Sequence, residues 1–479
     1  MKLNRATKIV ATLGPASSDR DVLKQMLLAG VDVVRLNFSH GVAEDHRQRA
    51  NLIRSLSKEI DREIAIMADL QGPKIRVGKF LNGKIQLEQG REFILDADCK
   101  LGDELRVGLD YKDLPKDVHA GDLLLLNDGL IVLKVQKVVG VCIHTLVEMG
   151  GELSNNKGIN RAGGGLTAPA LTEKDKEDLV TAIEMDVDYI AISFPKNADD
   201  MHFARSLANV VAQPLNKEIR LIAKIERAEA IMPGVLEGII DASDGIMVAR
   251  GDLAVEVGNA AVPALQKRMI FLANKQDKFV ITATQMMESM INSPIPTRAE
   301  VSDVANAVLD GTDAVMLSAE TAAGQYPVKT VEQMSAICLE AEKSQHVSLD
   351  ADFLDQTFTR IDQSIALGAL FTSFHLKVKA IAALTESGST VLWMSRHKID
   401  IPIFALTQKV KTQRALCMYR NVIPLHLEIS SNRDVALHQV EHLLSSKGVV
   451  ESGDMVTLTI GEPMGQPGGT NTLKIIKVK

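Results

Sequence analysis

Eight short apolar runs recur along the chain, each preceded by a helix-like segment and followed by polar or charged residues. The runs cover residues 8–14, 32–38, 64–70, 188–194, 220–226, 245–251, 279–285 and 313–319. Their apolar character is continuous rather than alternating, which is typical of strands buried on both faces of a parallel sheet. Eight such strands with intervening helices predict an α/β protein built on a (β/α)8 TIM barrel.

The segments between the runs carry helix start and stop signals. Thr297 and Glu300 have the spacing of a capping box, and Gly311 is placed to end the helix that follows. Ser17 and Ser18 are expected to begin an earlier helix. These signals support the alternation of strands and helices.

The regular spacing is broken once, between the third and fourth runs. Residues 71–165 are β-rich and interrupted by glycine, which predicts an inserted β-domain. Its strand candidates are 74–80, 84–90, 91–97, 122–129, 130–140 and 141–147. The flanking segments 1–70 and 166–345 together contain 250 residues, and a single barrel typically has about 250.

A third domain is predicted for residues 346–479, after a long helix-like stretch at 326–343. Its strand candidates are 380–385, 401–407, 422–427, 455–461 and 472–478. The alternation of these strands with helix-like segments predicts an open α/β sheet.

Composition excludes several classes of protein. The formal net charge is −7 and the pI is near 5.9, so no overall positive field favours nucleic acid or an anionic membrane. No stretch approaches the roughly 20 apolar residues of a spanning helix, and Gly14 and Pro15 interrupt the first apolar run too early for a signal peptide. The 4 cysteines lie far apart, which favours a reducing, cytoplasmic location.

Polar residues gather where the apolar runs end, and in TIM barrels the reacting residues project from those ends. The residues concerned are Arg35, Asn37, Ser39, His40, Asp69, Lys224, Glu226, Arg250, Asp252, Thr284, Gln285, Ser318 and Glu320. Any one of them could be a structural ion pair or a cap. Their convergence on one end of a barrel indicates an active site.

Lys224 and Glu226 are two residues apart on a predicted strand, so both side chains point to the same face. With Asp252 from the next strand end, they form an oxygen-rich site of the kind that Mg²⁺ binds when substrate oxygens complete its coordination. A structural ion pair is the alternative. Gly251 follows an apolar strand and leads into a short helix, whose first N–H groups could bind a carboxylate or phosphate, although an ordinary tight turn also fits.

Several segments together resemble the pyruvate kinase family, and most closely its bacterial type. They are 35–41, 69–76, 223–230, 244–256, 281–290, 296–327 and the Thr-Asn-Thr near 470. The resemblance spans all three predicted domains, and it implies that the inserted β-domain is a β-barrel that closes over the substrates as a lid. It implies phosphoryl transfer from phosphoenolpyruvate to ADP, giving pyruvate and ATP in the last step of glycolysis, by a cytoplasmic homotetramer.

The resemblance also implies roles for individual residues. Glu226 and Asp252 would hold a divalent ion, Mg²⁺ or Mn²⁺, and the main-chain N–H groups of Gly251 and Asp252 would receive the carboxylate of phosphoenolpyruvate. Lys224 would lie against the transferring phosphoryl group, with Arg35 neutralising phosphate oxygens. Compensation of negative charge is what a loose phosphoryl-transfer transition state requires.

Further residues follow from the same resemblance. Arg76 would join Arg35 on the phosphate oxygens, and Asn37, His40 and Arg76 are implied as cofactor-binding residues, with a second divalent ion arriving with ADP. Thr284 and Ser318 would place the hydroxyl and water chain that protonates the enolate of pyruvate. Simple hydrogen bonding at strand ends is the alternative for these two residues.

Many members of the family bind K⁺ through residues that correspond to Asn37, Ser39, Asp69 and the carbonyl of Leu70. All four are present here. In K⁺-dependent members, however, the position of Lys74 is a glutamate. Because a lysine ammonium could supply the charge that the monovalent ion otherwise brings, we expect that K⁺ is not required.

The segment TESGST in the third domain resembles the loop that binds an effector phosphate in this family. Thr385, Ser387, Gly388, Ser389 and Thr390 could surround a phosphate with hydroxyl and main-chain N–H groups. A plain helix N-cap turn fits the chemistry almost as well. The resemblance favours a sugar-phosphate or nucleotide effector.

Two other classes of protein stay open on the residues alone. One is a metal-dependent barrel lyase or aldolase that acts on pyruvate enolates, since the fold itself does not exclude it. The cationic residues Lys224, Arg35 and Arg76, together with the lid, favour phosphoryl transfer. The other is a non-catalytic binding protein, which would be expected to have lost a metal ligand or the lysine.

Overall fold

The computed structural model describes residues 5–344, 358–397, 399–430, 432–463 and 468–479. Eight strands close into a barrel in the order β1-β16-β15-β14-β13-β12-β3-β2. They are β1 (Lys8–Thr12), β2 (Val33–Asn37), β3 (Ala65–Asp69), β12 (Tyr189–Ile192), β13 (Arg220–Ile225), β14 (Gly245–Ala249), β15 (Phe279–Ala283) and β16 (Ala314–Leu317). Each lies inside one of the eight apolar runs, which confirms the predicted TIM barrel.

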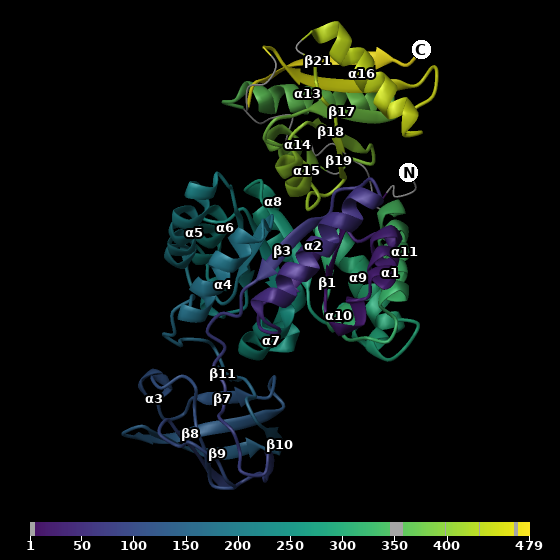
Figure 1. Cartoon of the computed structure of the whole chain (residues 1–479). Helices are drawn as coiled ribbons and strands as arrows, with labels where there is room; N and C mark the ends of the chain where they lie inside the picture. The colour runs from purple at the N-terminus through teal and green to yellow at the C-terminus, as the bar shows by residue number, and fades with distance from the viewer. Residues whose placement is uncertain (1–4, 345–357, 398, 431, 464–467) are drawn as a thin grey trace. The chain divides into compact units, whose positions relative to one another are not determined.

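Helices separate the barrel strands along the chain (Figure 1). The α-helices are α1 (Arg20–Ala29), α2 (Ala43–Glu59), α4 (Glu173–Glu184), α5 (Ala198–Ala212), α6 (Val235–Asp241), α7 (Arg250–Val257), α8 (Val262–Lys275), α9 (Arg298–Asp310), α10 (Ala319–Ala322) and α11 (Pro327–Lys343). Short 3₁₀ turns are η1 (Pro15–Ser17), η2 (Gln213–Leu215), η3 (Glu229–Ile231), η4 (Asn259–Ala261) and η5 (Glu288–Ile291).

Of two helix starts predicted from cap residues, one is confirmed and one is wrong. Helix α9 begins after Thr297, whose side chain forms the predicted capping box with Glu300. The expectation that Ser17 and Ser18 begin α1 is wrong, because Ser17 belongs to η1 and the α1 cap is Asp19. The Asp19 carboxylate accepts hydrogen bonds from the first amides of α1 and also favours the positive end of the helix dipole.

The insert contains two sheets, a six-stranded one in the order β11-β7-β8-β9-β5-β6 and a two-stranded one that pairs β10 with β4. The elements are β4 (Lys84–Leu87), β5 (Glu92–Asp96), β6 (Arg106–Val107), α3 (Leu114–Asp117), β7 (Leu123–Leu126), β8 (Ile131–Val139), β9 (Cys142–Met149), β10 (Gly151–Ser154) and β11 (Ile159–Arg161). One apolar core, which includes Phe93, Leu124 and Leu133, is shared by the strands.

Some predicted details of the insert are wrong. The candidate strand 74–80 forms only isolated bridges, such as Arg76 with Gly158 and Val77 with Leu109. Strands β6, β10 and β11 and helix α3 were not predicted, because two to four residues are too few for a periodic pattern to be recognised.

The last part of the chain forms a five-stranded sheet in the order β19-β18-β17-β20-β21. Its elements are α13 (Ile361–Leu376), β17 (Ala380–Leu384), α14 (Ser389–Ser395), β18 (Ile403–Thr407), α15 (Val410–Leu416), β19 (Val422–His426), α16 (Arg433–Ser446), β20 (Met455–Gly461) and β21 (Thr470–Lys477). The first four strands pair in parallel and β21 is antiparallel to β20. This confirms the predicted open α/β sheet.

Contacts divide the chain into two compact units that do not follow the three predicted domains. Unit 1 is Met1–Ala68, Glu184–Ile190 and Ile270–Lys479, and unit 2 is Asp69–Ile183 and Ala191–Met269. The domain boundaries at residues 70, 165 and 345 therefore stay a prediction. Within the described residues, no helix is both long enough and apolar enough to cross a membrane.

Candidate active site

Unit 2 contains a buried cluster of one lysine and several carboxylates. Lys224 lies on β13, and its Nζ is 2.9 Å from Glu226 Oε1 and 3.4 Å from Asp69 Oδ1. The Glu226 and Asp69 side chains are each 1% exposed, and that of Lys224 is 12% exposed. The two side chains meet, as the sequence predicted, although β13 ends at Ile225 and Glu226 directly follows the strand.

The ionised form of Glu226 is disfavoured in this cluster. Burial, with a smaller contribution from the nearby carboxylate of Asp252, raises the pKa of Glu226 to about 7, although the Lys224 ammonium opposes the shift. A carboxyl group whose ionised form is disfavoured in this way gains from an added cation. The cluster is therefore suited to a positively charged ligand beside Glu226 and Asp252.

Asp252 lies in the first turn of α7, directly after β14. Its Oδ1 is 3.3 Å from the Nζ of Lys74, and both side chains are partly exposed. Gly251 is in the same first turn, where the amide N–H groups of a helix point outward along its axis. The ammonium of Lys74 thus pairs with Asp252, whereas Asp69 pairs with Lys224.

Two residues at the end of β12 also belong to this cluster, and the sequence analysis missed them. The Ser193 hydroxyl accepts a hydrogen bond from Lys224 Nζ at 2.8 Å, and the Phe194 N–H donates to Glu226 Oε2 at 2.9 Å. Their position at the end of the fourth apolar run was the available signal. Serine and phenylalanine carry no charge, so they did not stand out beside lysine and glutamate.

Arg76 lies at the start of the insert and is half-buried. Its main-chain N–H donates to Asp110 Oδ1 at 2.7 Å, and its Nη1 is 3.4 Å from the carbonyl of Lys74. Burial raises the pKa of Asp110, with the bond from the Arg76 amide opposing the shift. The position of Arg76 is thus tied to the sheets of the insert.

In unit 1, Arg35 on β2 donates from Nη1 to Thr12 Oγ1 at 3.1 Å. The residues after β2 form a tight turn, in which the Ser39 N–H donates to Asn37 Oδ1 at 3.2 Å and the His40 N–H donates to the Asn37 carbonyl at 3.2 Å. The structure thus groups Asn37, Ser39 and His40 in one turn at the end of β2.

Thr284 and Ser318 follow β15 and β16. Thr284 has a φ of 69°, which is an outlier for a β-branched residue, and such strain is often found at functional sites. The Ser318 N–H donates to Glu320 Oε2 at 2.6 Å, and burial raises the pKa of Glu320. Gln285, also predicted here, shares the left-handed conformation with a φ of 51°.

The donor set fits a divalent cation. Glu226 and Asp252 offer carboxylate oxygens, which hard cations prefer. Among the described residues, no three or more His, Cys, Asp and Glu side chains form a group that could hold a metal ion. A site with two protein carboxylates, completed by substrate oxygens and water, is the arrangement that Mg²⁺ commonly uses.

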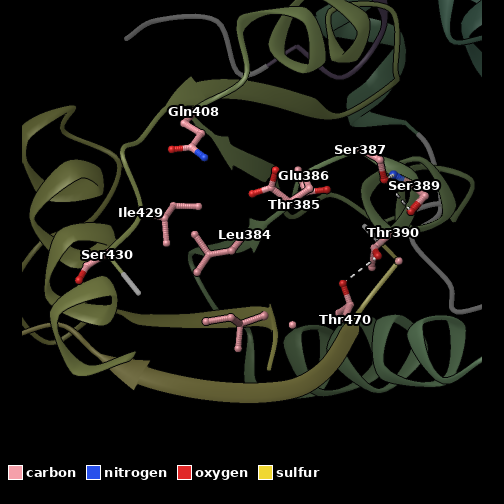
Figure 2. Close-up of a pocket in the computed structure, with 13 residues that line it drawn as sticks. Leu384, Thr385, Glu386, Ser387, Ser389, Thr390, Gln408, Ile429, Ser430 and Thr470 are labelled. Atoms are coloured by element: carbon pink, nitrogen blue, oxygen red, sulfur yellow. Dashed lines mark hydrogen bonds between the residues drawn. The ribbon is translucent and has the colours of Figure 1, made fainter. Parts of the chain in front are cut away.

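A separate cavity of about 150 Å³ lies in the C-terminal sheet domain. It is lined by Leu384, Thr385, Glu386, Ser387, Ser389, Thr390, Gln408, Ile429, Ser430, Ile460, Gly461, Gly468 and Thr470. Figure 2 shows the hydroxyl side chains of Ser387, Ser389 and Thr390 near one another at one end of this lining. We call it the hydroxyl cavity; it includes four of the five residues predicted to bind an effector.

The fifth, Gly388, shapes the loop of the hydroxyl cavity. It is the N-cap of α14 with a φ of 85°, and its N–H donates to Thr385 Oγ1 at 2.9 Å. A Cβ at this position would lie 2.9 Å from Leu416 Cδ2, so a larger residue would have to displace that side chain. The Thr390 and Thr470 hydroxyls are 3.0 Å apart.

A closed α/β barrel with a lysine and acidic metal-binding oxygens at its strand ends defines an enzyme of the metal-assisted TIM-barrel class. Comparison with known proteins narrows this class. Residues 4–331 match the family model described as pyruvate kinase, barrel domain, and residues 363–476 match pyruvate kinase, alpha/beta domain.

Relatives of full length agree with these matches. The chain is 50% identical over 479 residues to pyruvate kinase II of Salmonella typhimurium, covering 99% of each chain. It is 49% identical to a pyruvate kinase of Buchnera aphidicola (99% of each chain) and 48% identical to that of Haemophilus influenzae (95% of this chain, 96% of the other).

The chain belongs to the pyruvate kinase family. This confirms the predicted activity, a phosphotransferase acting in glycolysis, and sets aside the lyase or aldolase interpretation. A dependence on a divalent metal is general in this family.

Proposed function

We propose that this chain transfers the phosphoryl group of phosphoenolpyruvate to ADP through the cluster of Lys224, Glu226 and Asp252. The observation that carries the proposal is the buried Lys224 ammonium, held 2.9 Å from Glu226 at the end of a barrel strand. In a water-poor site such a charge stabilises a transition state far more than it would in bulk water.

Glu226 and Asp252 would hold the divalent ion, Mg²⁺ or Mn²⁺. When bound, the ion supplies positive charge that polarises phosphoryl oxygens and orients the substrate. The raised pKa of Glu226 supports this assignment, because burial disfavours the ionised carboxylate more than the Lys224 ammonium stabilises it, and a bound cation would favour the ionised form.

The remaining charges of the substrate would be met by groups around this pair. Lys224 would contact the transferring phosphoryl group, and Arg35 and Arg76 would neutralise its oxygens. The N–H groups of Gly251 and Asp252, in the first turn of α7, would receive the carboxylate of phosphoenolpyruvate. The insert that carries Arg76 would close as a lid and keep water from the phosphoryl donor.

Proton delivery and nucleotide binding would use residues of unit 1. Thr284 and Ser318 would position the hydroxyl and water chain that protonates the enolate of pyruvate. The strained backbone of Thr284, with its φ of 69°, supports a functional role for that residue. Asn37 and His40 would lie on the nucleotide side together with Arg76, where ADP brings its own divalent ion.

The experiment that tests this function measures ADP-dependent formation of pyruvate from phosphoenolpyruvate. Activity should require both ADP and a divalent ion, and should disappear when the ion is chelated and return when Mg²⁺ is restored. Pyruvate formation that does not depend on ADP would contradict phosphoryl transfer. Absence of turnover with every divalent ion would favour the remaining alternative, a non-catalytic binding protein.

The site for a monovalent cation would consist of Asn37, Ser39, Asp69 and the carbonyl of Leu70, with Lys74 replacing its charge. Support comes from the Lys74 ammonium, 3.3 Å from Asp252, which adds a fixed positive charge at the metal-binding carboxylates. We expect equal rates in tetramethylammonium and K⁺ salts. Strong activation by K⁺ would defeat this part of the proposal.

The hydroxyl cavity would bind a phosphorylated effector, a sugar phosphate or a nucleotide, that activates the enzyme. Thr385, Ser387, Ser389 and Thr390 offer hydroxyl donors around it, and the first amides of α14 add N–H groups. Initial rates at low phosphoenolpyruvate, measured across phosphorylated sugars and nucleoside monophosphates, test this. Rates that stay unchanged across the whole panel would refute it.

Family membership also supports a homotetramer in the cytoplasm as the working form. Light scattering coupled to gel filtration measures the mass directly, and four chains of 52.0 kDa are expected. A monomer at assay concentration would contradict that expectation.

A further inference from the structure

The hydroxyl of Ser193 lies between two groups of the active-site cluster. It donates to the carbonyl of Leu70 at 2.7 Å and accepts from Lys224 Nζ at 2.8 Å. Ser193 directly follows β12 and is fully buried, with 0% exposure. A hydroxyl has a single hydrogen, so its donation to Leu70 directs an acceptor lone pair toward the lysine.

Through this contact the Lys224 ammonium has a hydrogen-bond acceptor at the end of β12, in addition to acceptors at the ends of two other strands. The Nζ also lies within 3.4 Å of Asp69 and 2.9 Å of Glu226, at the ends of β3 and β13. An ammonium has three N–H donors on a flexible four-carbon stem. Because the three acceptors come from different strands, together they restrict where the charge can sit.

Ser193 differs from the two carboxylates in being neutral. Glu226 is assigned to the divalent ion in the proposed reaction, so its attraction for the lysine changes when that ion binds. The Ser193 hydroxyl keeps its orientation as long as it donates its hydrogen bond to the Leu70 carbonyl. It is thus a neutral acceptor that binding of the divalent ion leaves unchanged.

The surroundings of Ser193 hold it in this place. The next residue, Phe194, has a φ of 57° and donates its N–H to Glu226 Oε2. On the other side is Gly72, with a φ of 68°, where a Cβ would come within 2.6 Å of Ser193 Cβ. A left-handed conformation is unfavourable at a non-glycine residue, and Phe194 adopts it where its N–H reaches Glu226.

We propose that Ser193 is a positioning residue for phosphoryl transfer. Its hydroxyl, held by the carbonyl of Leu70, directs the Lys224 ammonium toward the transferring group. The inference rests on the role of Lys224 in the proposed function. It names a residue that acts through the lysine and does not itself touch the substrate.

Replacement of Ser193 by alanine tests the proposal against a matched control. Ser243 is a buried serine of the same unit whose Oγ donates to the Ile239 carbonyl at 2.7 Å, so Ser243→Ala removes a similar bond away from the cluster. We expect Ser193→Ala to lower kcat about 10- to 100-fold, the usual effect of a lost hydrogen bond to a charged group. The KM for phosphoenolpyruvate should change less than about threefold, and kcat of Ser243→Ala less than about twofold.

A double-mutant cycle separates positioning from a general structural effect. If Ser193 acts through the lysine, Ser193→Ala should change kcat less than about twofold once Lys224 has been replaced by methionine. The same loss in both backgrounds would overturn the proposal, as would a Ser193→Ala enzyme as fast as Ser243→Ala. Full activity of Lys224→Met alone would contradict the proposed function itself, which keeps the two failures distinguishable.

Discussion

The two regions assigned to phosphate groups, the Lys224 cluster and the hydroxyl cavity, are built from different chemistry. The cluster consists of ionisable groups, among which the Glu226 and Asp69 side chains are each 1% exposed and that of Lys224 is 12% exposed. The hydroxyl cavity is lined mainly by hydroxyl, amide and apolar groups, and its Glu386 pairs with Lys409 at 2.7 Å. Charged groups are thus concentrated in the cluster, where phosphoryl transfer is proposed. Neutral donors line the hydroxyl cavity, where a ligand would only bind and dissociate.

The regions also differ in how complete they are without a ligand. In the hydroxyl cavity, Thr390 bonds to Thr470, and Ser387 lies 3.2 Å from Ser389. In the cluster, burial raises the pKa of Glu226 to about 7, so the ionised carboxylate is not fully stabilised by its lysine partner. We infer that ligands complete the cluster electrostatically, whereas a ligand in the hydroxyl cavity would exchange one set of neutral hydrogen bonds for another.

After Lys224→Met, the largest effect is expected for Glu226→Gln. This variant removes the proposed anionic metal ligand and also weakens the partner of Lys224, 2.9 Å away. We expect kcat/KM for phosphoenolpyruvate to fall at least about 100- to 1,000-fold, the range seen when one preorganised charge is lost. Lys84→Met, at a lysine with a 62% exposed side chain, is the control and should stay near wild type. If kcat/KM of Glu226→Gln stays within tenfold of wild type, the charge of the Lys224 cluster does not carry the reaction.

A second prediction concerns the helix that connects the hydroxyl cavity with the barrel. Helix α14 starts at the cavity and ends at Ser395. The next residue, Arg396, has its Nη1 2.8 Å from Asp313 Oδ2, just before β16. Both side chains are buried, at 4% and 1% exposed. Arg396→Ala leaves the Asp313 carboxylate without this partner, and we expect about 3–5 kcal/mol of destabilisation.

The measurement is the shift of the thermal midpoint, expected to be at least about 5 °C. Arg20→Ala is the comparison, because Arg20 pairs with Glu59 at the surface with a side chain that is 50% exposed, and such pairs contribute about 0–1 kcal/mol. Equal thermal midpoints for Arg396→Ala and Arg20→Ala would contradict the claim that the buried charge of Arg396 stabilises the fold.

A third prediction uses pH. Burial lowers the pKa of His397 to about 4, with the charge of Arg396 contributing. The folded protein therefore keeps this imidazole neutral while the unfolded chain gains a proton below pH 6.5, so stability falls as pH falls. At pH 5 the loss is about 2 kcal/mol. His397→Phe, which retains a ring against Trp393, should flatten the difference in urea midpoint between pH 7.5 and 5; an unchanged difference would contradict the shift.

The smallest effect is expected for Thr390→Val, which keeps the shape of a residue only 4% exposed but removes its hydroxyl. One neutral hydrogen bond is worth about 0.5–1.5 kcal/mol, so the effector concentration for half activation should rise about 3- to 10-fold. Thr457→Val, at a buried threonine on β20 that accepts a bond from Ser373, is the control. A loss of effector response beyond 100-fold would show that the cavity depends on one strong contact, as the cluster does.

Sequence reasoning reached the fold through the buried strands. Runs such as 188–194 and 279–285 are apolar along their whole length, and that pattern has few explanations other than a parallel sheet with both faces covered. The short strands of the insert, such as Arg106–Val107, have no such pattern. They form because neighbouring strands offer unpaired main-chain groups, which is a property of the folded domain.

Some residues of the active-site cluster could be predicted from the sequence and others could not. Lys224, Glu226 and Asp252 were recognisable because ionisable groups at the ends of apolar strands are costly unless they serve a purpose. The partner of Lys74 was not recognisable: the structure pairs it with Asp252, a residue 178 positions away in the chain. Ser193 was missed because its importance comes from the 2.8 Å contact with the lysine and not from its own chemistry.

The most direct test of the account is the rate of a single turnover by Lys224→Met, with enzyme in excess over phosphoenolpyruvate and with saturating ADP and Mg²⁺. Quenched-flow measurement of ATP formation separates the chemical step from product release. We predict a rate at least about 1,000-fold below wild type, with binding of phosphoenolpyruvate largely retained. Transfer at the wild-type rate would contradict the claim that the Lys224 ammonium stabilises the phosphoryl group in the transition state.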